Sequence, residues 1–152
     1  MSDPQAILSD LALTTFRLNG QVLALAEDLA RPVGLTAARW QVLGAVLSEP
    51  LPVSTIARDM GMARQSVQRI ADILVDDGLA AYVDNPAHRR AKLLTPTKDG
   101  LTAVRRINPA HARAAAGLVA TLGADRATEV VQALHDLSAA LAHVAPCRTS
   151  NS

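Results

Sequence analysis

The sequence contains few of the residues that define disulfide-rich, β-sandwich or membrane proteins. Its one cysteine, Cys147, excludes an intrachain disulfide and a cysteine-based metal finger. Phe16, Trp40 and Tyr82 are its only aromatic residues, at 2% of the chain, which disfavours the strands of a β-sandwich. No apolar run approaches the roughly 18 residues of a membrane span, and no basic leader follows Met1. We therefore expect a cytoplasmic protein with no membrane partner.

Alanine and leucine dominate what is present. The 152 residues include 29 Ala and 21 Leu, which favour helices in about one domain. Hydrophobic residues reach 49% and charged residues only 19%, so we expect part of the apolar surplus in a subunit interface. The net charge of +1 is unevenly distributed: residues 1–57 carry −2, residues 58–106 carry +3 and residues 107–152 carry zero. A basic middle segment alone is a weak indication of nucleic-acid binding.

The first third of the chain predicts two helices. Asp3 can cap a long helix that begins at Pro4 and ends near Arg31-Pro32, because a residue before proline avoids the helical region. Thr36 then caps a helix that runs through Leu47 to the prolines that follow.

The last third also predicts two helices. The first follows Pro96 and is kinked at Pro109; Gly123 separates it from a helix over residues 124–144. Apolar stripes on these helices and on the first one must be buried. We expect them to form a dimer interface through Leu8, Leu11, Leu18, Leu118, Leu122, Leu134, Leu137 and Leu141. The alternative is an ordinary intrachain core.

Short elements fill the middle of the chain. Ser54 is expected to cap a brief helix that Gly61 breaks, and a second helix covers about residues 63–77. Residues 79–83 and 92–95 are short and apolar enough to be paired strands. The order predicts a helix-turn-helix followed by a two-stranded hairpin.

The second helix of a helix-turn-helix lies in the DNA major groove, where its early residues contact base edges. Arginine can bind guanine and glutamine can bind adenine, whereas serine can donate to bases or phosphates. This outward face has no carboxylate before Asp72. The candidate DNA contacts of the two helices are Ser54, Arg64, Gln65, Ser66, Gln68 and Arg69.

The hairpin turn carries His88, Arg89, Arg90 and Lys92. Such a basic wing can follow the DNA backbone or enter the minor groove, whose negative potential attracts arginine. Taken separately, the helix residues could be ordinary solvated side chains and the turn a solubilising loop. Together they favour DNA binding.

An ordered set of fragments resembles the MarR family of bacterial transcription regulators. The fragments are Leu35–Leu43 (LTAARWQVL), Ile56–Gly61 (IARDMG), Arg64–Val67 (RQSV), Leu74, Gly78-Leu79 and Arg89–Gly100 (RRAKLLTPTKDG), and the last block is the most specific. The resemblance implies a mainly α fold with a small β-hairpin wing: a winged helix-turn-helix with long N- and C-terminal dimerisation helices.

The resemblance also implies a domain layout and a function. Residues 1–34 and 101–145 would form the dimerisation helices, residues 35–100 the DNA-binding lobe and residues 146–152 a disordered tail, in one structural domain overall. The homodimer would bind a pseudo-palindromic operator on double-stranded DNA at the nucleoid, as a repressor, with release by a small aromatic or phenolic effector. No cofactor is implied.

Two positions depart from the family pattern. His88 stands where an aspartate commonly precedes the paired arginines, so the salt bridge that orients the wing is in doubt. Ala63 stands at the cap of the recognition helix, where serine or aspartate is usual.

Other function classes fit the sequence less well. The four histidines lack a metal-ligand spacing, and Cys147 lies in the tail, away from the first helix where thiol-sensing relatives carry their cysteine. No nucleophile elbow, phosphate loop or HExxH motif indicates an enzyme. The alternative to DNA binding is a winged-helix module for protein–protein interaction.

Overall fold

The computed structural model describes residues 3–144, and the predicted disordered tail with Cys147 lies outside these residues. The chain divides into two compact units between Pro109 and Ala110, and each is described by itself. None of the described helices combines the length and apolar character that a membrane span requires.

The first unit begins with the two predicted helices. Helix α1 covers Pro4–Ala30, and the Asp3 carboxylate accepts a hydrogen bond from the Gln5 amide at 3.2 Å. A 3₁₀ turn, η1, covers Arg31–Val33. Helix α2 covers Ala37–Ala45, and the Thr36 hydroxyl caps it by accepting from the Arg39 amide. The predicted extension to Leu47 is wrong: that side chain is 43% exposed, and the chain turns before it.

The predicted helix-turn-helix is confirmed. Helix α3 covers Val53–Met60, Gly61 closes it with a φ of +62°, and helix α4 covers Arg64–Asp76. Ser54 is not the cap of α3, however. The helix starts one residue earlier, behind Pro52, which has extended backbone and supplies no side-chain hydrogen bond.

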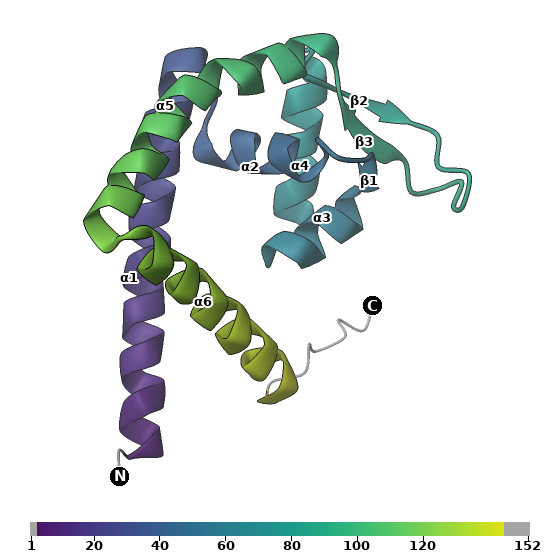
Figure 1. Ribbon diagram of the computed structural model, residues 1–152. Coiled ribbons are helices and arrows are strands. Elements are labelled where there is room, and N and C mark those ends of the chain that lie inside the picture. The colour runs from purple at the N-terminus through teal and green to yellow at the C-terminus, as the bar shows by residue number, and fades with distance from the viewer. Residues whose placement is uncertain (1–2, 145–152) are drawn as a thin grey trace. The chain divides into compact units, whose positions relative to one another are not determined.

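The predicted hairpin is part of a three-stranded sheet. Strand β2 covers Ala80–Val83, and β3 covers Leu93–Pro96, antiparallel to it. A two-residue strand, β1 at Leu51–Pro52, pairs with the other edge of β3, so the order is β1-β3-β2. Strand β1 was not predicted from the sequence, because two residues are too few for a periodic pattern. The β2–β3 loop projects away from the helices (Figure 1).

The core of this unit lies where α2, α3 and α4 meet the sheet. The predicted inward residues Ile56, Val67 and Leu74 are completely buried, and Ile70 is 8% exposed. They pack in one cluster with Leu43, Leu94 and Ile107, which come from α2, β3 and the first half of α5. Burial of this α4 stripe turns the opposite, polar face of the helix outward.

Helix α5 covers Lys98–Leu122 and contains Pro109, and Gly123 separates it from α6 at Ala124–Val144. The predicted kink at Pro109 stays a prediction. No residue of α6 is buried in the single chain. Among the predicted dimerisation residues, Leu118 is 59% exposed and Leu134 is 47% exposed in the single chain.

Gly100 allows the start of α5 to lie close to the backbone that follows α4. The Thr97 hydroxyl donates to the Gly78 carbonyl at 2.6 Å, and the Thr97 amide donates to the Leu79 carbonyl at 3.0 Å. A Cβ on Gly100 would collide with that same Leu79 carbonyl oxygen. This is backbone, so it cannot move aside as a flexible side chain would.

We expect Gly100→Ala to lower the free energy of unfolding by about 1–3 kcal/mol, the usual cost of overpacking, as measured by urea denaturation. The matched control is Gly44→Ala, an exposed glycine of α2 with nothing within 4 Å of an added Cβ. The control should gain about 0.5–1 kcal/mol from helix propensity. Equal effects of the two substitutions would contradict the close approach.

The start of α4 supplies a second prediction. Ala63 has the extended backbone of a cap but no side-chain hydrogen bond. Ala63→Ser should therefore raise the free energy of unfolding by about 1 kcal/mol, measured in the same way. Thr36→Ala, which removes the observed cap of α2, should lower it by a similar amount. An unchanged midpoint for Ala63→Ser would mean that another group already satisfies the helix start.

Candidate nucleic-acid interface

The exposed face of α4 carries the polar residues that the sequence analysis selected. Arg64, Gln65, Gln68 and Arg69 are exposed, and Ser66 is half-buried. Val67 and Ile70 lie between them in the sequence and point into the core. Because the helix repeats every 3.6 residues, these polar side chains occupy the first two turns on the outer side.

The β2–β3 loop carries the predicted basic wing. His88, Arg89, Arg90 and Lys92 are all exposed. Backbone hydrogen bonds shape the loop: the His88 amide donates to the Asn85 carbonyl, and the Ala91 amide donates to the His88 carbonyl, both at 3.2 Å. The Asn85 side chain also accepts from the Ala87 amide at 3.0 Å. The loop that carries His88 is therefore shaped by these turns.

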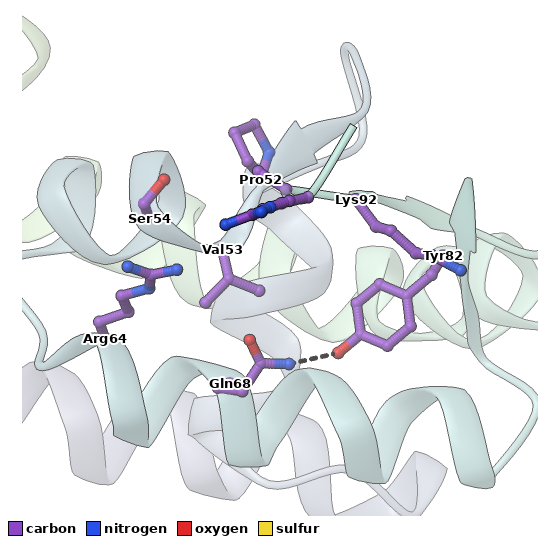
Figure 2. A pocket seen from close by; sticks show the side chains of 9 residues that line it. Pro52, Val53, Ser54, Arg64, Gln68, Tyr82 and Lys92 are labelled. Carbon is purple, nitrogen blue, oxygen red and sulfur yellow. Dashed lines mark hydrogen bonds between the residues drawn. The ribbon is translucent and has the colours of Figure 1, made fainter. Parts of the chain in front are cut away.

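Helix α4 and the β2–β3 loop meet at one hollow of about 260 Å³. Arg64 and Gln68 line it from α4, Tyr82 lines it from β2, and Lys92 lines it from the β2–β3 loop (Figure 2). Ser54, at the exposed start of α3, lies on its rim, so the structure brings this residue to the predicted face although it is not a cap. The full lining is Pro52, Val53, Ser54, Arg64, Gln68, Tyr82, Arg90, Ala91 and Lys92.

The positive charges of this surface have no carboxylate partner within the described chain. The ion pairs there involve Arg31, Arg39, Arg58 and Arg126. Arg64, Arg69, Arg89, Arg90 and Lys92 take part in none of them. Unpaired surface cations on two neighbouring elements can bind a polyanion without first breaking an internal ion pair.

A network of three side chains joins α4 to β2. The Tyr82 hydroxyl donates to Asp72 Oδ1 at 2.5 Å, and Gln68 Nε2 donates to the Tyr82 oxygen at 2.9 Å and to Asp72 Oδ1 at 3.0 Å. Burial, followed by the Asp72 carboxylate, raises the pKa of Tyr82 well above its usual value. The phenol therefore remains a donor at neutral pH.

Tyr82 was not among the site residues predicted from the sequence, and Asp72 was noted there only as the first carboxylate on the outward face of α4. The spacing of Gln68 and Asp72, four residues apart on one helix face, is a signal that could have suggested their hydrogen bond. Tyr82 offered no such signal, because only the β2–β3 register brings it to α4.

No group of three or more His, Cys, Asp or Glu side chains in the described chain is arranged to hold a metal ion.

The sequence of this chain is similar to those of known proteins. Residues 33–91 match the model of the MarR family. The Mycobacterium tuberculosis protein Rv2011c, described as uncharacterized, is 41% identical over 93 residues, which cover 61% of this chain and 65% of that protein. The match therefore spans less than two thirds of that relative's length.

Solved structures share the fold over nearly the whole chain. The repressor CouR, bound to a 23-mer DNA duplex, has a TM-score of 0.75 at 25% identity, covering 91% of this chain and 99% of that one. The regulator Sco5413 of Streptomyces coelicolor, described as a MarR family member, has a TM-score of 0.73 at 26% identity, covering 90% and 97%. The chain thus has the winged helix-turn-helix fold of solved MarR family transcription regulators, and its residues 33–91 are similar to that family.

Proposed function

We propose that the protein is a sequence-specific DNA-binding transcription regulator that inserts α4 into the major groove. One observation carries the proposal: Arg64 of α4 and Arg90 and Lys92 of the wing line the same hollow, and none is in an ion pair. A duplex supplies phosphates along each edge of a groove, which suits cations on two neighbouring elements.

The elements divide the work of recognition. Arg64, Gln65, Gln68 and Arg69 stand on the exposed face of α4, where they would contact base edges, and Ser54 and Ser66 would donate to nearby phosphates or bases. His88, Arg89, Arg90 and Lys92 would follow the backbone or the minor groove.

A homodimer is part of the proposal. Helix α1 leaves Leu8 58%, Phe16 72% and Leu18 41% exposed. Leu122 and Leu141, in α5 and α6, are about as open, at 40% and 42%, whereas Leu11 and Leu137 are half-buried. Apolar surface on this scale favours burial against a second copy. Two-fold symmetry would then place two recognition helices about 34–36 Å apart on a pseudo-palindromic operator.

The first unit also offers a place for an effector. A hollow of about 520 Å³, within the size range of small-molecule sites, lies beside α1 and α2 and is lined in part by Leu23, Gln41 and Met62. That CouR is a repressor bound to DNA favours repression here. Release by an aromatic effector and association with the nucleoid stay predictions from the family.

DNA binding should depend steeply on salt. In a fluorescence-anisotropy titration with duplexes enriched from a random library by the purified protein, affinity should fall by orders of magnitude between about 50 and 200 mM salt. If the affinity does not change with salt, or if the selection enriches no particular sequence, the protein–protein interaction module is favoured instead.

Substitutions should separate the helix from the wing. Arg64→Ala should cost about 1–3 kcal/mol at particular base positions, whereas Arg89→Ala should weaken all sequences alike and reduce the salt slope by about 1 for each subunit of the dimer. Arg17→Ala, the same charge change on exposed α1, is the control. The assignment of groove and wing fails if the first two variants behave alike.

The oligomeric state can be tested separately by light scattering at micromolar concentration. We expect twice the chain mass of 16.0 kDa, because the apolar stripes would otherwise face water. A mass of one chain would refute the dimer.

A further inference from the structure

Gln68 is exposed at the centre of the recognition face, yet its side chain is held in place. Its amide nitrogen donates to the Tyr82 oxygen at 2.9 Å and to Asp72 Oδ1 at 3.0 Å. Asp72 stands one helical turn further along α4, whereas Tyr82 belongs to β2. The side chain is thus connected both to its own helix and to the sheet that carries the wing.

The chemistry of the two partners determines which way the amide faces. An ionised carboxylate only accepts hydrogen bonds, so Asp72 can pair with the Gln68 nitrogen and not with its oxygen. The one proton of the Tyr82 hydroxyl goes to Asp72, at 2.5 Å, which leaves the phenol oxygen as an acceptor toward Gln68. A reversed amide would place its oxygen against two other oxygens. Gln68 Oε1 is therefore turned away from Tyr82, as Figure 2 shows.

We propose that Tyr82 and Asp72 are positioning residues that make Gln68 a hydrogen-bond acceptor toward the base it faces. This inference rests on the proposed function and specifies the reading of one base. In the major groove, adenine and cytosine present amino donors, whereas the corresponding groups of guanine and thymine are acceptors. A Gln68 whose nitrogen is taken up by Tyr82 and Asp72 offers its oxygen to a base, and accordingly selects an adenine or a cytosine.

The network acts on selectivity more than on affinity. An unrestrained glutamine can rotate its amide and offer either its oxygen or its nitrogen, so it can bind to bases that present donors and to bases that present acceptors. The network removes that choice before DNA binds, and it also removes side-chain freedom that binding would otherwise have to immobilise. Phosphate contacts by Arg89 or Lys92 do not depend on it.

The test compares binding of duplexes that carry each of the four bases at the position where Gln68→Ala changes the preference. Tyr82→Phe keeps the ring but removes the hydroxyl. We expect it to reduce discrimination at that position about tenfold, the lower part of the range for a good base contact. Preferences at other positions and the salt slope should not change, and thermal unfolding of the variant establishes that it is folded.

A double-mutant cycle isolates the network. In the Gln68→Ala background, Tyr82→Phe should have no further effect on base preference, because the side chain that it positions is gone. Asp72→Asn should also reduce discrimination, since an asparagine can face Gln68 with either its oxygen or its nitrogen. Asp76→Asn, the same charge change on exposed α4 outside the three-residue network, should change affinity for all duplexes alike and leave discrimination intact.

The outcomes distinguish the two proposals. If the wild-type protein prefers no sequence, the proposed function fails. Suppose instead that the wild-type protein is selective. If the Tyr82→Phe variant then discriminates among bases at this position as well as the wild type does, or weakens binding of every duplex equally, only the positioning role is overturned. The positioning role is also overturned if Gln68→Ala changes no base preference, or if the effects of Gln68→Ala and Tyr82→Phe on base preference are additive in the double mutant.

Discussion

The burial of one face of α4 is the constraint on which the candidate interface depends. Val67 and Leu74 are completely buried, in one cluster with side chains from α2, α3, β3 and α5. Rotating the helix to bury its other face would bring Arg64, Gln68 and Arg69 into an apolar core without partners, at a cost of several kcal/mol for each charge. The apolar stripe therefore determines both the stability of the lobe and the identity of the outward side chains.

The sheet relates the wing to this helix. Strand β3 lies between β1 and β2, and its Leu94 is fully buried in the same core as α4. Because β1 leads directly into α3, the strand pairing connects the base of the wing to the helix-turn-helix at two places. Arg90 and Lys92 consequently reach the hollow that Arg64 lines, although more than twenty residues separate them in the sequence.

Most elements of the fold could be predicted, because their ends depend on local chemistry. Asp3 and Thr36 cap the helices that follow them, and Gly61 ends the helix before it. Each acts within a few residues of its own position. Three other details did not follow from such local signals. Helix α2 stops before Leu47, and Leu51–Pro52 form a strand only because β3 provides an edge. Ser54 resembles a cap, but α3 begins before it.

The sequence by itself determined the helical class, the helix-turn-helix, the basic character of the wing and the apolar stripes at both ends, since periodicity, caps and breakers act over a few residues. Only the tertiary structure decided that Gln68, Asp72 and Tyr82 form one network. It alone also joined wing and helix at one hollow. Both depend on strand register and on packing between residues far apart in the chain, where a shift of one position turns every strand side chain to the other face.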